Sequence, residues 1–185
     1  MVVFETASPE NTLPALKIAF DKASELSADV VLPSTSGATA LKAMEFAKKI
    51  GFGGKIIVVS HAWGMRNPGE NTMSDKDRKT LEDAGITVVT AAHALSGTER
   101  ALSTGFSGTY PVETLANALR ILCSGVKVCI EISAMAMDAG KLAYQRPVVA
   151  MGGTRDGVDT VCVLTPSYSA KILDARIHEI LCKPY

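Results

Sequence analysis

The sequence predicts a three-layer α/β fold, in which a mainly parallel sheet carries helices on both faces and an antiparallel hairpin at one edge. Segments with helical spacing alternate with short β-branched runs through most of the 185 residues, the pattern of parallel strands joined by helices. Near the end of the chain, two apolar runs at 147–151 and 160–165 flank a glycine-rich stretch at 152–157, which is typical of a hairpin. The length suits a single domain over residues 1–185.

The first half of the chain predicts two steps of helix followed by strand. Apolar residues at helical spacing predict a helix over Thr12–Leu26, with Pro14 in its first turn, and then a strand over 29–32. A second helix begins at about Gly37 and is broken by the glycines of 51–54, before a strand over 55–60. The residues expected to face the core from these helices are Leu13, Leu16, Phe20, Ala23, Leu26, Leu41, Met44 and Ala47.

The second half predicts two further helices and strands, separated by long irregular segments. Ser74, with Asp77 three positions later, predicts the capped start of a charged, solvent-facing helix that ends at Ala84, before a strand over 86–90. Pro111 predicts the start of a helix over 111–123, followed by a strand over 127–132. The residues expected to be buried on the helix that starts at Pro111 are Val112, Leu115, Leu119 and Leu122. The segments 61–73 and 91–110 are long for connections in a compact domain, and such loops are more often functional than not.

Composition excludes several classes of partner. Lys plus Arg and Asp plus Glu each number 19, so the chain lacks the basic field that drives nucleic-acid binding. Residues 1–5 carry neither a basic leader nor an apolar segment, and no apolar run approaches the roughly 18 residues that span a bilayer. We therefore expect a cytoplasmic protein with no nucleic-acid or membrane partner, and the sequence is compatible with a homo-oligomer.

The cysteines and histidines do not have the spacing of metal ligands. No C-x-x-C pair occurs, and most cysteines lie among apolar neighbours, so we expect reduced core residues. Glu131, placed at the end of a predicted strand, and Asp138 are the carboxylates that could meet a cation, but we expect no metal site. The four cysteines are Cys123, Cys129, Cys162 and Cys182.

A run of hydroxyl residues between a predicted strand and a predicted helix is the strongest local sign of a binding site. A helix N-terminus offers unpaired N–H groups and partial positive charge, while Gly37 permits close approach of an oxyanion. The sequence therefore predicts a phosphate site, although Ser and Thr are also ordinary helix caps and capping alone is the alternative. The run is Ser34, Thr35, Ser36, Gly37, Ala38 and Thr39.

Two later loops also begin where predicted strands end, and ligands of open α/β sheets bind beyond such strand ends. The loop over 60–73 could hold a planar, polar-edged ligand beside Trp63 or Met65. His61 in this loop and His93 in the loop over 92–100 could act as bases, because imidazole titrates near neutrality. Ordinary surface loops with structural histidines are the alternative, and we expect His178 to be structural.

The hairpin connection offers a further candidate contact. Gly152, Gly153 and Thr154 could close over a ligand with backbone N–H groups, and Arg155 could add a guanidinium. A simple hairpin turn is the alternative for this stretch.

Several segments carry a resemblance to a known family. They are Gly69-Glu70-Asn71-Thr72-Met73, the stretch from His93 to Arg100, Val128-Cys129-Ile130-Glu131-Ile132, and Gly152-Gly153 ahead of Asp159-Thr160. On these residues the chain resembles the α/β domain at the C-terminus of pyruvate kinase, and more closely a family of stand-alone archaeal and bacterial proteins built from that domain alone. The resemblance spans nearly the whole chain and implies the pyruvate kinase C-terminal domain-like fold.

The resemblance also implies a ligand. In allosteric pyruvate kinases, the segment similar to 35–40 holds a phosphate of the sugar-bisphosphate activator, which would give that role to Thr35, Ser36, Gly37 and Thr39. The barrel domain that transfers phosphoryl groups is absent, so no kinase activity is implied. Stand-alone members look like binders of flavin mononucleotide (FMN), and the resemblance supplies no reaction.

Three functional hypotheses follow. The first is an FMN-binding protein, with or without oxidoreductase activity on an unknown substrate, whose loops around Trp63, Asn71 and His93 frame the flavin ring. The second is a non-catalytic sensor of a sugar phosphate or another nucleotide, and the third is a scaffold without a small ligand. The residues expected to contact the ligand are Ser34, Thr35, Ser36, Gly37, Ala38, Thr39, His61, Trp63, Gly69, Asn71, Thr72, Met73, His93, Ser96, Gly97, Arg100, Glu131, Gly152 and Gly153.

Overall fold

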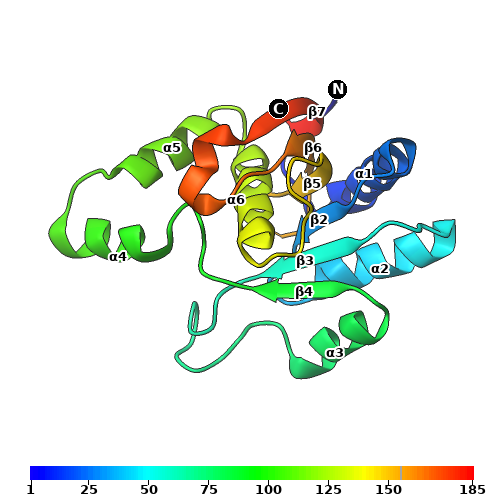
Figure 1. Ribbon diagram of the computed structural model, residues 1–185, viewed down its shortest axis with the longest axis horizontal. Coiled ribbons are helices and arrows are strands. Elements are labelled where there is room, and N and C mark those ends of the chain that lie inside the picture. Colours follow the sequence, from blue (N-terminus) through cyan, green and yellow to red (C-terminus); the bar gives the residue numbers. More distant parts are fainter. Residues whose placement is uncertain (155) are drawn as a thin grey trace.

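One seven-stranded sheet runs through the computed structural model, which describes residues 1–154 and 156–185 (Figure 1). Its strands lie in the order β1-β7-β6-β5-β2-β3-β4. They comprise β1 (Val2–Phe4), β2 (Val30–Pro33), β3 (Ile56–Ser60), β4 (Thr87–Thr90), β5 (Val148–Gly152), β6 (Thr160–Thr165) and β7 (Arg176–Pro184). The predicted three-layer α/β class is confirmed, and β1 and β7 are strands that the sequence analysis did not identify.

The sheet is mainly parallel, with one strand running the other way. β5, β2, β3 and β4 are parallel to one another, and β1 is parallel to β7 at the opposite side of the sheet. β6 is antiparallel to both β5 and β7, and β5 and β6 form the predicted hairpin. The carboxyl ends of β2, β3, β4 and β5 consequently meet at one edge of the sheet, where the loops with candidate site residues begin.

Helices cover both faces of the sheet. α1 (Thr12–Leu26), α2 (Ala38–Ile50) and α3 (Asp75–Asp83) contribute to the core on one face. α5 (Pro111–Arg120) and α6 (Ser124–Asp138) pack on the other face, and α4 (Gly97–Phe106) stands out with α5 to one side of the body (Figure 1). Two short 3₁₀ helices, η1 (Pro9–Asn11) and η2 (Ser169–Asp174), complete the elements.

The first helix has its predicted bounds but a narrower buried face. Leu16, Phe20 and Ala23 are fully buried as expected, whereas Leu13 is 59% exposed and Leu26 is 40% exposed. The buried stripe is completed by the small residues Ala15 and Ala19, which let the helix approach the sheet closely. Leu13 lies beside the buried stripe, which Thr12 begins, and Leu26 is the last residue of the helix.

The predicted strand over 127–132 is wrong, because these residues belong to α6. The run is mostly apolar, with Lys127 and Glu131 inside it, and a short run of this kind cannot be assigned to a buried strand or a buried helix from periodicity alone. α6 packs between the sheet and the elements α5 and η2, so nearly every residue from Gly125 to Met137 is buried. The preceding helix ends at Arg120 rather than at 123, which leaves Leu122 47% exposed.

Several local predictions are confirmed. The Ser74 side chain accepts a hydrogen bond from the Asp77 backbone N–H and so caps α3. All four cysteines are free thiols, and three of them are buried.

The part of the chain that the structure describes contains no helix long and apolar enough to cross a membrane.

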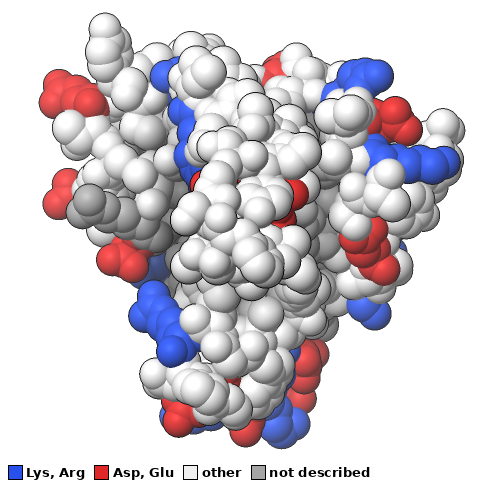
Figure 2. Space-filling model, turned by 90° about the vertical axis from the view of Figure 1, so that its left-hand side faces the viewer, with Lys and Arg blue, Asp and Glu red and all other residues white. Residues whose placement is uncertain are grey.

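Charges of both signs are distributed over the surface. On the face shown in Figure 2, Lys, Arg, Asp and Glu side chains gather towards the margins and leave a broad uncharged surface between them. Neither sign forms a continuous field on this face, in agreement with the balanced composition.

Candidate functional site

A pocket of about 650 Å³ lies at the edge of the sheet where the parallel strands end. Its walls come from the turn after β2, the start of the loop after β3, His93 after β4 and the connection between β5 and β6. The first half of α6 and the start of α1 close its sides. This volume is in the range of small-molecule and cofactor sites.

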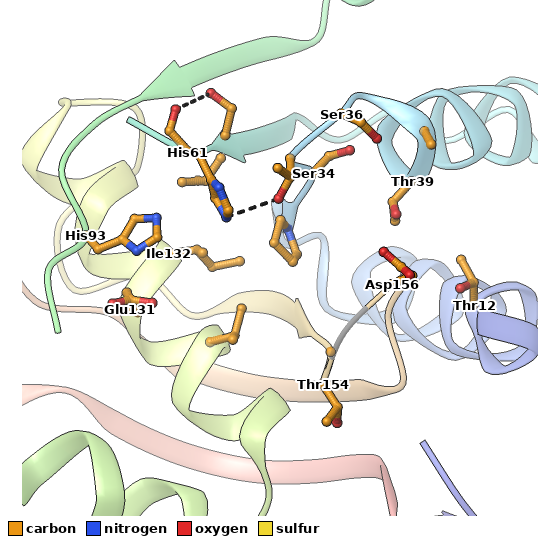
Figure 3. Close-up of a pocket in the computed structure, with 18 of the residues that line it drawn as sticks. Thr12, Ser34, Ser36, Thr39, His61, His93, Glu131, Ile132, Thr154 and Asp156 are labelled. Atoms are coloured by element: carbon orange, nitrogen blue, oxygen red, sulfur yellow. Dashed lines mark hydrogen bonds between the residues drawn. The ribbon is translucent and has the colours of Figure 1, made fainter. Parts of the chain in front are cut away.

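The turn from β2 into α2 forms one end of the pocket (Figure 3). Gly37 adopts φ of +93°, a left-handed conformation that glycine tolerates, and its carbonyl accepts from the Leu41 N–H. Ser34 Oγ accepts from the Ala40 N–H, so the capping interpretation is correct for Ser34. Among the described residues, nothing accepts from the amides of Ala38 and Thr39, the first two of the helix.

Hydroxyl groups, the cation of Lys42 and the carboxylate of Asp156 line this end of the pocket (Figure 3). Ser36 and Thr39 line the pocket from α2 and the turn before it, and Lys42 lies one turn further along the helix. Thr12, at the start of α1, faces them across the pocket and accepts from the Val158 N–H. Thr35 shares a hydrogen bond of 3.1 Å with Nε2 of His61.

Two histidines form the middle of the pocket. The rings of His61 and His93 meet edge to face, with their centroids 5.0 Å apart. Burial lowers the pKa of His61, repulsion from Arg66 and from His93 in its protonated form lowers it further, and Glu131 raises it. Burial also lowers the pKa of His93, while Glu131 raises it. Both rings are therefore held in the neutral form that can accept a proton.

These two histidines should make the stability of the fold depend on pH. Since their folded pKa values lie below the ordinary 6.5, the unfolded chain binds more protons near and below that pH. The free energy of unfolding should then fall as pH is lowered from 8 through 6.5. Denaturant titrations across this range should show a shallower fall for His61→Asn than for the wild type. A wild-type slope retained in His61→Asn would contradict the assignment.

A buried ion pair lies beside the histidines. Lys127 and Glu131 are each 5% exposed and bond one another across one turn of α6. The second carboxylate oxygen of Glu131 accepts from the Leu95 N–H at 3.0 Å, which ties the loop after β4 to α6. Burial lowers the pKa of Lys127, although its bond to Glu131 opposes the shift. Glu131 thus lies in the middle of a helix and not, as the sequence analysis expected, at the end of a strand.

The pocket brings together about half of the predicted site residues. Those that line it come from the turn before α2, both histidine loops, α4, α6 and the hairpin. They are Ser34, Thr35, Ser36, Ala38, Thr39, His61, His93, Arg100, Glu131 and Gly153. The other predicted contacts do not line it, and they are Gly37, Trp63, Gly69, Asn71, Thr72, Met73, Ser96, Gly97 and Gly152.

The predicted contacts in the loop after β3 have structural positions. Asn71 donates to the His61 carbonyl and accepts from the Met73 N–H, so it holds the loop that carries His61. Met73 is 2% exposed and belongs to the core. Trp63 is 59% exposed outside the pocket, and Met65 lines the pocket instead.

Gly152 is a packing residue. A Cβ atom on it would overlap the carbonyl of Gly125, where α6 crosses the end of β5. Gly153 lines the pocket, and a Cβ atom on it would overlap the carbonyl oxygen of Gly157. Arg155, the predicted guanidinium of this stretch, lies outside the described residues.

Sequence reasoning missed several lining residues that no local motif signals. Thr12 and Lys42 reach the pocket from helices that were interpreted only for their buried faces, and Arg120 does so from the end of α5. Lys127 stands four residues before Glu131, a spacing that pairs them on a helix but not on the predicted strand. Among the described residues, no group of three or more His, Cys, Asp and Glu is arranged to hold a metal ion.

Comparison with protein-family models gave no match for this chain.

Proposed function

We propose that the protein binds a phosphorylated small molecule in this pocket, with FMN as the foremost ligand. The observation that carries the proposal is the helix start at one end of the pocket, where the amides of Ala38 and Thr39 are unbonded among the described residues. Hydroxyls of Ser36 and Thr39 and the ammonium of Lys42 add donors around the same point. Such a set suits a phosphate group.

The protonation state and tautomer of His61 affect the hydrogen bonds that Thr35 can offer at the phosphate end of the pocket. A neutral His61 with its proton on Nε2 donates to Thr35 Oγ1, and the Thr35 hydroxyl hydrogen is then directed elsewhere. That hydrogen is available to a phosphate oxygen in the pocket. Nδ1 of His61 is buried without a partner among the described residues. In this tautomer Nδ1 carries no hydrogen, so no buried N–H group is left without an acceptor.

The other end of the pocket supports a planar ring. Met65, Val128 and Ile132 supply apolar contacts, and the neutral His61 and His93 supply polar edges. FMN combines one terminal phosphate with one planar ring, which matches the two parts of this pocket, and the family resemblance points to the same ligand. Any redox chemistry would come from the flavin, while these residues would bind and orient it.

FMN binding can be tested with a paired ligand. The absorption spectrum of untreated purified protein should show bound flavin, and added FMN should lose fluorescence on binding. Riboflavin, which has the ring but no phosphate, should bind much more weakly. Colourless protein that leaves FMN fluorescence unchanged would exclude FMN. Ligand-dependent melting with a panel of sugar phosphates and nucleotides would then separate a phosphate sensor from a protein without a small ligand.

Thr39→Val should weaken FMN binding by about tenfold, because it removes one hydroxyl donor to a charged phosphate while keeping the side-chain shape. Riboflavin affinity should be unaffected. Thr80→Val is the matched control, since Thr80 lies on the exposed side of α3 and donates to the Lys76 carbonyl. Equal FMN affinities for Thr39→Val and the wild type would place the phosphate elsewhere.

A further inference from the structure

Three basic side chains line the end of the pocket away from the phosphate loop. Arg100 comes from the first turn of α4, Arg120 from the last turn of α5 and Lys127 from α6. Their charges act on one another, since Arg120 and Arg100 both lower the pKa of Lys127. Arg100 also lowers the pKa of His93, which Figure 3 places beside Glu131 and opposite Thr12 and Thr39.

Neither Arg100 nor Arg120 forms an ion pair with a carboxylate of the described residues. Within the described part of the chain, Lys127 pairs with Glu131, whereas neither guanidinium has an Asp or Glu oxygen within 4.0 Å. Arg120 donates to the Asn117 side chain at 2.7 Å, which leaves most of its donors unused. Both guanidinium-bearing side chains are exposed, so a ligand can reach them.

Two acidic residues stand near these arginines and must be considered. Glu99 and Glu113 line a small neighbouring cavity together with Arg100 and Arg120, but neither lines the main pocket. The Glu99 carboxylate accepts from the Glu113 N–H and so caps the first turn of α5. The donors that face the main pocket from this end are therefore cationic, with Glu131 already used by Lys127 and Leu95.

We propose that Arg100 and Arg120 form a second anion subsite, which binds a negatively charged group at the end of the ligand remote from its phosphate. The proposal rests on the proposed function, because the first phosphate fixes the ligand in the pocket. Guanidinium groups bind carboxylates and phosphates through paired hydrogen bonds, and two of them from different helices fix both position and direction.

The negatively charged group that this subsite binds can come from two sources. One is a second phosphate or a carboxylate on the ligand itself. The other is the ring edge of FMN, which becomes negatively charged when the flavin takes up two electrons and one proton from a reductant. Arg100 and Arg120 would stabilise either form relative to a neutral group at that place.

The test uses matched probes and matched variants. Alkanediols of increasing length, each with one terminal phosphate or two, are titrated calorimetrically into the wild type, the double variant Arg100→Gln/Arg120→Gln and Arg66→Gln. Arg66 is exposed and acts electrostatically on His61 without lining the pocket, so it controls for long-range charge. In parallel, the midpoint potential of bound FMN is measured by dithionite titration in the same proteins.

A second anion subsite predicts that the wild type binds a bisphosphate of suitable length about tenfold tighter than the monophosphate. This ratio should fall to about one in the double variant and persist in Arg66→Gln. If the ring edge is the source, the midpoint potential of FMN should instead fall in the double variant alone. The subsite is excluded if the ratio survives in the double variant, or if neither the ratio nor the potential depends on the arginines.

Failure of the subsite and failure of the proposed function can be told apart. Monophosphate or FMN binding that Thr39→Val weakens, without any effect of the arginines, would overturn the subsite alone. Absence of binding by every phosphorylated probe would overturn both.

Discussion

Replacing Lys127 with methionine is expected to lower the free energy of unfolding by about 3–5 kcal/mol, because it leaves Glu131 as an unpaired charge inside the protein. Lys127 and Glu131 are each 5% exposed, and the carboxylate has the Leu95 N–H as its other partner. Methionine keeps the length and the apolar stem of lysine, so the change tests the lost charge rather than a cavity. Chemical denaturation at neutral pH, compared with the wild type, measures the effect.

The double variant Lys127→Met/Glu131→Gln is the matched control. The glutamine oxygen can still accept from the Leu95 N–H, and no charge is left in the core, so most of the lost stability should return. If the double variant is as unstable as the single one, the loss comes from packing around Lys127 and not from the unpaired carboxylate.

The sequence predicted the order of most elements because their signals are local. Pro14, Ser74 and Pro111 mark positions close to where helices begin, and apolar residues three and four positions apart distinguish α1 and α2 from the strands beside them. α6 was assigned as a strand because a helix buried on every side has no amphipathic period. α6 is buried because it packs between the sheet and α5, and this tertiary arrangement cannot be inferred from the local sequence.

The candidate site was predicted where it follows strand ends and missed where it depends on helix faces. Thr39 and His93 line the pocket because parallel strands bring their carboxyl ends to one edge. Thr12 and Lys127 reach the same pocket from helices on opposite faces of the sheet, an arrangement that only the packing of α1 and α6 determines. Trp63 was a reasonable ring partner by residue type, but its loop turns it to the surface.

Gly152→Ala is expected to lower the free energy of unfolding by about 3 kcal/mol, at the upper end of the range for overpacked cores. The added Cβ would overlap the backbone of Gly125, which has no flexible side chain that could move aside. β5 and the first turn of α6 would have to separate, and this shift would displace Lys127 and Gly153 at the pocket. Denaturation midpoints and FMN affinity, measured on the same preparation, should therefore both decrease.

Gly105→Ala is the control for this substitution. Gly105 lies in α4 with open space around its Cα, so alanine should leave stability unchanged or raise it by about 0.5–1 kcal/mol through helix propensity. The pair also distinguishes two roles for Gly152. If its backbone served mainly to contact the ligand, as the sequence suggested, Gly152→Ala would lose FMN affinity at wild-type stability. If it serves to seat α6 against β5, stability falls even when no ligand is present, and the loss of affinity follows from the displaced helix.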